Sequence, residues 1–523
     1  MKRAGAIAGW CALAWVTLLG GLNSFGFLGP DEPRYAAIAR AMLRTHDFIT
    51  PRLWGQPWFE KPVLFYWLGA ASDWLHGGER LPNALLAVAL CGGLWWFLRR
   101  CHSERAGVLA GFMGLTSAFV IGFGRAATTD LPLTCMLSFG LMALYLESAW
   151  SGVFLGLAAL AKGPVAVVLA VMIWVAYRAT QRRWEFPRLV ATVAWFAAAA
   201  GPWYVAVAVR NPSFIKVFFW QHNVERFATG RFEHPQAFWF YGPVLLLTVF
   251  PWTGWLGLPL AAVCRRWRRL GWGPAWRAAD VPLKAYLAFW CAVPVVFFSI
   301  SQSKLPGYIL PAVPAAIGLV AVCAAESWER MARWPLAISA VLAGLIPAAL
   351  RWAPVWQPRA MLADPFTRIL IVAAVAVLLL LALRRRAVAL VVANCILVAV
   401  GVGALTQGHM SEAIDLADSG RPLAMALGAQ CSEGLPRACG NVPLYTWRLD
   451  RGLVYSAQYY LQGELTAFPE TAPPANAIVI IPRRELGAFV ARFGKQLQMA
   501  TLSRFNPGGG TPSWEALRVA ARR

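Results

Sequence analysis

The residues best suited to chemistry stand together in residues 25–67, directly after a first apolar segment. Ionisable side chains are interspersed there with aromatic ones; they are Asp31, Glu32, Arg34, Glu60 and Lys61. A carboxylate can take a proton from an attacking hydroxyl, and cations can neutralise the charge on a departing phosphate. We therefore expect this part of the chain to carry the reaction centre.

Further ionisable residues stand where other apolar segments end. They are Arg125 with Asp130, Lys162 before Gly163 and Pro164, His222 with Glu225 and Arg226, His234, and Lys304 with Tyr308. Any one of them could be an interfacial anchor or half of a local ion pair. A charged group at the edge of hydrocarbon is costly unless it faces a cavity or a partner, so their gathering on one predicted side of a membrane favours a shared site.

The mixture of residue types indicates the kind of substrate. Several cations beside few acids suit a phosphate group, and aromatic walls suit a sugar or a lipid chain. A sugar carried on a lipid phosphate leaves readily once cations neutralise the departing oxygens. An acceptor hydroxyl would need a base, for which Asp31 is the candidate, whereas an acceptor phosphate is already anionic. Lys61, Arg34 and Arg226 are the candidate phosphate-binding cations.

The composition predicts a membrane protein that positions these residues on helices. Of 523 residues, 59% are apolar and only 14% are charged, with 27 Trp and 29 Phe, which is typical of a mainly α, polytopic membrane protein. The net charge of +23 fits cationic cytoplasmic loops and contact with anionic membrane lipid, so we expect no nucleic-acid partner. No Walker loop, GxGxxG, HExxH or GxSxG motif occurs, which argues against ATP-driven transport, dinucleotide chemistry and two hydrolase classes.

Thirteen apolar segments could cross a bilayer. They are residues 5–28, 82–98, 106–124, 131–147, 152–161, 164–178, 189–209, 239–263, 282–300, 306–324, 334–350, 366–383 and 387–407. The first resembles a signal peptide, but its apolar run is too long and no cleavage site follows, so we expect an uncleaved span. Arg-rich loops alternate with longer mixed loops, which by the positive-inside rule places the N-terminus inside and the tail outside.

The chain is expected to divide into a transmembrane domain, residues 1–407, and a small external α/β domain, residues 408–523. The expected elements of the tail are strands at 442–447, 453–461 and 477–481 and a helix at 485–493. Cys431 and Cys439 of the tail could form a disulfide or remain two free thiols. The other eight cysteines lie in or beside apolar segments, where a lone Cys is usually a small apolar filler.

Two predicted external loops are long, residues 29–80 and 210–238. Residues 32–44 have the pattern of a helix that lies along the membrane surface, with Asp31 at its N-cap. Its apolar face consists of Tyr35, Ile38, Ala39, Met42 and Leu43, and Arg40 and Arg44 are opposite. Helical spacing brings Arg34 beside Asp31.

Glu60 and His222 are the carboxylate and histidine that could bind a divalent metal ion, zinc or magnesium. Two ligands without Cys or HxxxH spacing make a sparse site. A histidine with its hydrogen bonds satisfied at the surface is the alternative interpretation of His222.

The order of several motifs resembles one family. The motifs are D-E-x-R-Y-A, F-E-K-P-x-L-x-Y-W, G-R-x-x-x-x-D, A-L-x-K-G-P, H-x-x-x-R-F and S-K-L-P-x-Y-x-L-P. They are similar to those of the polyprenyl-phosphate-sugar-dependent membrane glycosyltransferases of the GT-C fold, closest to the bacterial lipid A 4-amino-4-deoxy-L-arabinose transferases and related to the protein O-mannosyltransferases. The resemblance covers most of residues 1–410.

The resemblance implies roles for individual residues. Asp31 would be the principal catalytic carboxylate, with Asp130 and Lys61 beside it in the catalytic set. The donor phosphate and lipid would be bound by, or their pocket shaped by, Arg34, Tyr35, Lys61, Lys162, Arg226, Lys304 and Tyr308. Glu60 and His222 would match a divalent-metal site. Val63, where the family usually has a second proline, and Gln221, where this branch often has an acid, depart from the pattern.

The function that follows as an expectation is that of an inverting glycosyltransferase in a bacterial inner membrane, with its site facing the periplasm. It would move a sugar from undecaprenyl phosphate to lipid A or a related lipopolysaccharide part. The sugar stays open, because Asp130, Glu32 and Glu225 could each face the ammonium group of an aminosugar. Two alternatives are a protein Ser/Thr or polysaccharide acceptor with the same donor, and a transporter or flippase for a lipid-linked substrate, although no internal symmetry supports the latter.

Overall fold

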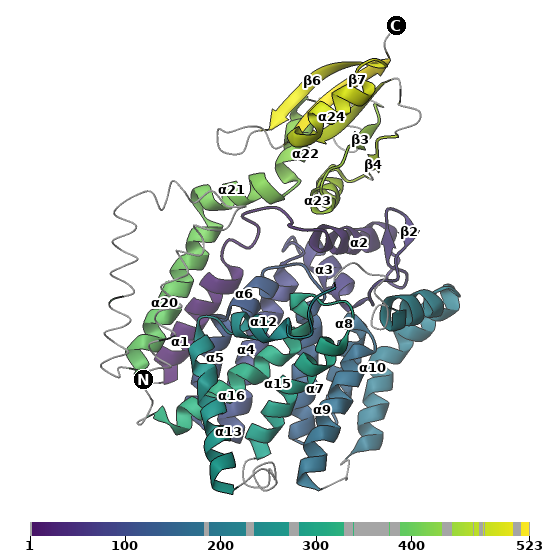
Figure 1. The fold of residues 1–523 in the computed structure, drawn as a ribbon. Coiled ribbons are helices and arrows are strands. Elements are labelled where there is room, and N and C mark those ends of the chain that lie inside the picture. The colour runs from purple at the N-terminus through teal and green to yellow at the C-terminus, as the bar shows by residue number, and fades with distance from the viewer. Residues whose placement is uncertain are drawn as a thin grey trace.

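The computed structural model describes residues 3–182, 188–225, 235–270, 282–328, 387–430, 442–463, 465–469, 476–505 and 514–521, with the single residues 338, 376 and 474. A bundle of apolar helices carries at one end a smaller part built on a five-stranded sheet (Figure 1). The predicted fold class, a mainly α polytopic membrane protein with a small C-terminal α/β part, is confirmed.

Five of the described helices are long and apolar enough to cross a membrane. They are α4 (Leu81–Cys101), α10 (Leu189–Arg210), α15 (Pro282–Ile300), the continuous η5 and α16 (Pro306–Ala312 and Val313–Glu326), and α20 (Ala387–Thr406). Runs of about 20 apolar residues favour such helices, because only intrahelical hydrogen bonds satisfy the backbone in lipid.

Other apolar helices are bent or shorter. The bent pairs are α5 with α6 (Glu104–Leu115 and Ala118–Gly124), at 56°, and α12 with η3 and α13 (Tyr241–Thr248, Trp252–Leu256 and Gly257–Leu270), at 112°. The shorter helices are α1 with η1 (Arg3–Ala14 and Trp15–Leu19), α7 (Asp130–Tyr145), α8 (Ser151–Lys162) and α9 (Val165–Gln181). Counting each bent pair as one span gives up to seven candidate spans among the described residues. The predicted number of thirteen is therefore not confirmed, and the predicted segments 334–350 and 366–383 lie outside the described residues.

The first predicted span, 5–28, is too long. Its helix ends at Leu19, and an irregular loop continues to α2. Gly20 has an extended backbone and Gly21 a positive φ of 59°, and a chain that enters the left-handed region stops propagating an α-helix. This early end leaves residues 20–30 available for tertiary contacts.

The loop that follows contains α2 (Asp31–Thr45), a hairpin of β1 and β2 (Arg52–Leu53 and Gln56–Pro57) and α3 (Leu64–Trp74). The predicted apolar face of α2 is confirmed in its main members, because Tyr35, Ile38, Ala39 and Met42 are buried. The predicted N-cap is wrong by one residue. The helix already begins at Asp31, after Pro30, and no side chain caps it.

The C-terminal part follows α20 and consists of helices around one sheet. The helices are α21 (Gly408–Asp418), α22 (Arg421–Gln430), α23 (Arg451–Leu461) and α24 (Arg483–Phe493); the strands are β3 (Leu444–Thr446), β4 (Thr466–Ala467), β5 (Asn476–Pro482), β6 (Leu497–Phe505) and β7 (Trp514–Ala521). The strand order is β4-β3-β5-β7-β6, with β3 parallel to both of its neighbours and β7 antiparallel to β5 and β6. The predicted division at residue 408 into two domains stays a prediction.

Strand β5 explains why this sheet needs helices on both faces. Ile478 and Ile480 belong to one apolar cluster, with residues of α22 and α23, whereas Val479 and Ile481 belong to another, with Phe489 of α24. Side chains alternate between the faces of a strand, so a continuous apolar run is buried only when both faces are covered. The strand predicted at 477–481, the helix at 485–493 and the core of the strand at 442–447 are confirmed.

The strand predicted at 453–461 is wrong, because these residues form the helix α23. The Asp450 side chain caps this helix by accepting a hydrogen bond from the Gly452 N–H at 2.8 Å. The buried residues Gly452, Ser456 and Tyr459 then follow at helical spacing. Figure 1 shows α23 between the sheet and α2, and this placement brings the tail to the candidate site.

Candidate active site

The centre of the candidate site is the guanidinium of Arg34 on α2. It bonds to the Asp31 carboxylate one helical turn earlier, and its Nη1 lies 3.4 Å from Glu60 Oε2. Its Nε donates to the Pro30 carbonyl at 2.9 Å. Lys61 joins the same cluster, with its Nζ 3.3 Å from Glu60 Oε1. The predicted neighbourhood of two cations and two carboxylates is therefore present.

The members of this cluster differ in their access to solvent. The Arg34 side chain is 6% exposed, whereas that of Asp31 is 48% exposed. A buried cation thus holds an open carboxylate in place, and Asp31 is the group that an incoming molecule can reach. The Lys61 and Glu60 side chains are intermediate at 12% and 13%.

The electrostatics of the cluster keep both Arg34 and its neighbour Tyr35 in their ordinary protonation states. Burial alone would lower the pKa of Arg34, but the charges of Glu60 and Asp31 raise it above its ordinary value. Burial, and then the same two carboxylates, raise the pKa of Tyr35 well above its ordinary value. Tyr35 therefore remains a neutral phenol. Its ring packs against the rings of Phe65 and Tyr66, with centroid distances of 6.1 and 6.0 Å. Tyr35 therefore forms part of the aromatic wall of the candidate site.

A second cluster gathers Asp130, Lys162 and Tyr308 from three helices. Asp130 begins α7, Lys162 ends α8, and Tyr308 lies on η5. Lys162 bonds to the Asp130 carboxylate, and its Nζ lies 4.9 Å from the centre of the Tyr308 ring. Gly163 ends α8 with a positive φ of 83°, so the chain turns away directly after the lysine. These three predicted residues are brought together.

Other predicted residues lie differently. Lys304 is buried and its Nζ donates to the Ser301 carbonyl at 2.6 Å. Arg125, expected beside Asp130, donates instead to the Gly20 and Gly21 carbonyls at 2.9 and 2.7 Å, where it holds the end of the first helix. Arg226 and His234 lie outside the described residues, as do Cys431 and Cys439.

The expected metal site gains no support. No group of three or more His, Cys, Asp or Glu side chains within the described parts of the chain could hold a metal ion. His222 lies on the π-helix η2 (Lys216–Glu225), and the two Glu60 oxygens already contact Arg34 and Lys61. This donor set does not fit a metal centre, so no catalytic step is derived through a metal.

A residue that sequence reasoning missed, Arg80, binds Glu32. Its Nε and Nη2 lie 2.9 and 2.8 Å from the two Glu32 oxygens, and the Arg80 and Glu32 side chains are only 2% and 7% exposed. Arg80 also donates to three backbone carbonyls of the loop before α2, those of Leu22, Phe25 and Gly26. Arg80 stands immediately before the N-terminus of α4, where a cation is unfavourable because it opposes the helix dipole. This unfavourable position was the sequence feature that could have indicated an acidic partner for Arg80.

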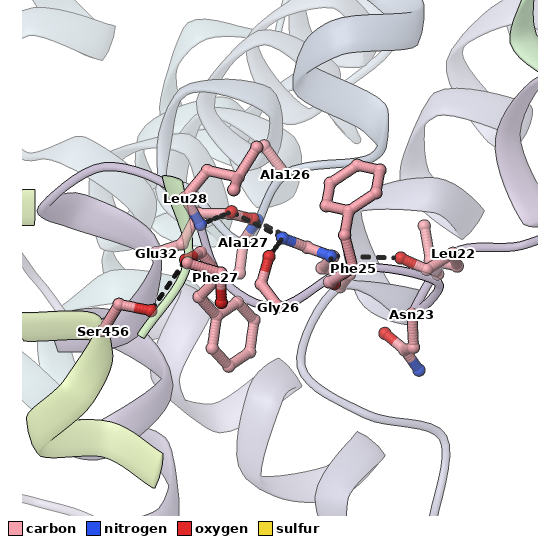
Figure 2. A network of polar contacts seen from close by, with 12 residues as sticks. Leu22, Asn23, Phe25, Gly26, Phe27, Leu28, Glu32, Ala126, Ala127 and Ser456 are labelled. Atoms are coloured by element: carbon pink, nitrogen blue, oxygen red, sulfur yellow. Dashed lines mark hydrogen bonds and ion pairs between the residues drawn. The ribbon is translucent and has the colours of Figure 1, made fainter. Parts of the chain in front are cut away.

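Glu32 connects the two clusters. Figure 2 shows its carboxylate beside the backbone of Leu28 and Ala127, whose N–H groups donate to it at 2.9 and 2.7 Å. Ala127 lies three residues before Asp130, and Glu32 follows Asp31 directly. These two N–H groups and the two bonds from Arg80 occupy the acceptor positions of the Glu32 carboxylate. Of the three carboxylates considered for an aminosugar, Asp130 and Glu225 remain.

The described structure has the fold of a polytopic GT-C membrane glycosyltransferase. Its likeness to the crystal structure of ArnT from Cupriavidus metallidurans bound to undecaprenyl phosphate has a TM-score of 0.73, covers 99% of both chains and comes with 22% sequence identity. For the apo state of the same protein the TM-score is also 0.73, over 100% of both chains.

Curated relatives agree with the resemblance seen in the motifs. The chain is 36% identical over 330 residues to the undecaprenyl phosphate-alpha-4-amino-4-deoxy-L-arabinose arabinosyl transferase of Edwardsiella ictaluri, covering 58% of this chain and 57% of the relative. It is 31% identical over 339 residues to the protein of the same name from Aeromonas salmonicida, covering 60% and 59%. The chain thus spans less than two thirds of the length of these relatives. No protein-family model matches it.

Proposed function

We propose that this chain is an inner-membrane glycosyltransferase that moves a sugar from undecaprenyl phosphate to lipid A or a related lipopolysaccharide acceptor at the periplasmic face. The names of the similar curated proteins and the GT-C fold support this reaction. The observation that carries the proposal is the open Asp31 carboxylate held by the buried Arg34, with Lys61 in the same cluster. Such a cluster suits a reaction in which a phosphate departs from a sugar.

In the proposed step, an acceptor oxygen attacks the anomeric carbon of the sugar from the face opposite the donor phosphate. The bond between that carbon and the donor phosphate oxygen breaks, and the electron pair stays with the undecaprenyl phosphate. Lys61 and Arg34, with Arg226 as a further candidate, stabilise the charge that develops on the departing oxygens. An acceptor phosphate needs no base, whereas for a hydroxyl acceptor Asp31 takes the proton.

The second cluster is assigned to the sugar. Asp130 is paired with Lys162, whose Nζ lies over the aromatic ring of Tyr308. A carboxylate is the natural partner of a sugar ammonium group and an aromatic face packs on a sugar ring, so Asp130 and Tyr308 are the candidates for an aminosugar such as 4-amino-4-deoxy-L-arabinose. Lys304 remains a candidate through its motif alone.

A protein or polysaccharide acceptor would use the same donor chemistry, so the product distinguishes these reactions. The test incubates the purified full-length protein with the undecaprenyl-phosphate-linked aminosugar and lipid A, and measures the mass of lipid A. We expect a mass increase of one aminosugar residue. No mass change on lipid A, with donor consumed only when a protein or polysaccharide is supplied, would contradict the proposed acceptor, and no donor consumption with any acceptor would contradict the transferase.

A variant makes this test specific for the site. Lys61→Met removes a cation from the cluster and should lower the rate by about a hundredfold, because a charge-stabilising donor of this kind contributes about 2.7–4 kcal/mol. Lys284→Met is the matched control, since Lys284 pairs with Glu326 away from the candidate site, and it should transfer sugar at the unmodified rate. Equal rates for the two variants would contradict the assignment of Lys61.

A further inference from the structure

Helix α23 of the C-terminal part places an aromatic side chain on the candidate active site. The centre of the Tyr455 ring lies 5.1 Å from Arg34 Cζ, closer than the rings of Trp58 and Tyr35 at 5.6 and 5.9 Å. A guanidinium within about 6 Å of a ring centroid is attracted by the negative face of the ring, and more strongly where water is excluded. Arg34 is 6% exposed, so this contact falls in the favourable range.

We propose that Tyr455 is a positioning residue of the active site. Its ring fixes the guanidinium of Arg34 for the phosphate of the lipid donor, so the site is complete only when α23 is seated on α2. The proposal rests on the proposed function, since it assigns part of the same site. It gives the C-terminal part a task in donor binding.

Buried hydrogen bonds next to Tyr455 hold α23 against the loop before α2. Ser456 Oγ donates to the Phe27 carbonyl at 2.8 Å, and the Phe27 N–H donates to the Tyr460 hydroxyl at 3.0 Å; Figure 2 shows the Ser456 hydroxyl directed at Phe27. Ser456 also accepts the Gly420 N–H at 2.8 Å. Buried hydrogen bonds of this kind fix geometry, because leaving either partner unpaired is costly.

The backbone of the tail packs closely at two points, leaving no room for a Cβ at the first and little at the second. A Cβ at Gly420 would lie 2.2 Å from the Ala457 nitrogen, and one at Gly452 would lie 3.1 Å from Gly29 Cα. Gly452 stands three residues before Tyr455 on α23, and Gly29 stands two residues before Asp31. The helix that carries Tyr455 is thus in direct contact with the loop that leads into the reactive carboxylate.

Further contacts from the tail hold the same loop. Asp415 accepts the Gly26 N–H at 2.7 Å and bonds to Arg421. Arg421 in turn donates to the carbonyls of Asn23 and Ser24 at 3.3 and 2.9 Å. One turn after Tyr455, Tyr459 donates to Glu79 at 2.5 Å. These contacts fix the backbone of α23 and of the loop before α2, and so hold the helix that carries Tyr455 beside Arg34.

The test measures binding of undecaprenyl phosphate without a sugar, and the KM and kcat for the sugar-linked donor, with the purified full-length protein. Tyr455→Leu should weaken binding and raise the donor KM by about three- to tenfold, as expected for the loss of one desolvated cation–π contact. The kcat should fall as well, by a comparable factor at most, because Arg34 also stabilises the charge that develops on the departing oxygens. Tyr455→Met, which also lacks a π face, should behave alike and serves if the leucine variant does not fold.

Two matched variants separate positioning from general loosening of the tail. Tyr455→Phe keeps the ring and should bind as the unmodified protein does. Tyr445→Leu removes a tyrosine of β3 whose ring packs on Phe468, and it should leave donor binding unchanged. If Tyr455→Phe or Tyr445→Leu weakens binding as much as Tyr455→Leu, the role of Tyr455 is structural and the proposal fails.

A double-mutant cycle tests the coupling directly. In an Arg34→Gln background, Tyr455→Leu should cause no further loss of undecaprenyl phosphate binding, because the site cation that the ring contacts is gone. Arg451, whose Cζ lies 5.6 Å from the centre of the same ring, is present in both backgrounds and cancels in the cycle. An additional three- to tenfold loss there would overturn the proposal. Binding that depends on Tyr455 in a protein that transfers no sugar would reject the proposed reaction but keep the inference. Normal transfer and binding by Tyr455→Leu would reject the inference alone.

Discussion

Two neighbouring carboxylates, Asp31 and Glu32, begin the same helix in opposite environments. Glu32 accepts two bonds from Arg80 and two from backbone N–H groups, and its side chain is 7% exposed. Asp31 has Arg34 on one side and is 48% exposed. Glu32 is saturated and so can only hold the structure, whereas Asp31 keeps free acceptor capacity at a surface that a substrate can reach.

The difference shows how this fold combines a fixed backbone with an accessible carboxylate. The Glu32 network joins the loop before α2, the loop before α7 and the start of α4 through Leu28, Ala127 and Arg80. These bonds fix the backbone from which Asp31 and Asp130 project. A reactive group on a fixed backbone loses little entropy when the substrate arrives, so it can remain open without being disordered.

The largest expected effect comes from breaking the closed network. Arg80→Met leaves Glu32 buried without its cation and should lower the free energy of unfolding by about 3–5 kcal/mol. Thermal or denaturant unfolding of the purified protein measures it. Arg448→Met is the control, because its ion pair with Glu485 is 58% and 24% exposed, and such surface pairs contribute about 0–1 kcal/mol. Similar losses in both variants would contradict the distinction between a closed network and a surface pair.

A third carboxylate, Glu79, extends the comparison of Asp31 with Glu32. It is buried like Glu32, but its pKa lies near neutrality. Burial raises the pKa of Glu79 from 4.5 to about 7. The negative charge of Asp73 adds to this upward shift, whereas the positive charges of Arg40 and Arg80 oppose it. The folded state therefore binds this proton more tightly than the unfolded chain does. The resulting stability is fully present below about pH 4.5 and is lost as the pH rises through about 7, by roughly 3 kcal/mol at most.

We expect Glu79 to make the free energy of unfolding depend on pH, and the substitution Glu79→Gln to reduce that dependence. The free energy of unfolding, measured between about pH 4.5 and 8, should fall with rising pH in the unmodified protein and should be flatter in Glu79→Gln. The glutamine keeps an oxygen that can accept from Tyr459 and Arg40, which contact Glu79 at 2.5 and 3.3 Å. An unchanged slope in the variant would show that another group is responsible.

Local spacing made one half of the site predictable. Asp31 and Arg34 stand three residues apart on an amphipathic helix, and their ion pair followed from helical geometry alone. The gathering of Asp130, Lys162 and Tyr308 on one side could be predicted as well, because each residue stands at or near the end of an apolar segment on the same predicted side.

Contacts between distant segments were not predictable from one sequence. Arg80 lies 48 residues after Glu32, and no local pattern selects that partner. The apolar residues of helix α23 also fit a period of two, which predicts a strand, and only burial against α2 and the cluster that contains Ile478 and Ile480 of β5 decides between the two periods. The role of Tyr455 could therefore emerge only from the folded structure.

The most direct test of the account compares Asp31→Asn with Glu32→Gln in the same purified protein. We predict that Asp31→Asn lowers sugar transfer to lipid A by at least about a hundredfold, because it removes both the carboxylate that pairs with Arg34 at the departing phosphate and the base for a hydroxyl acceptor. The unfolding temperature should stay unchanged, since Arg34 keeps Glu60, whereas Glu32→Gln lowers the unfolding temperature and its folded fraction still transfers sugar. Undiminished transfer by Asp31→Asn, or unchanged stability in a Glu32→Gln protein that no longer transfers sugar, would contradict the division of tasks between the two carboxylates.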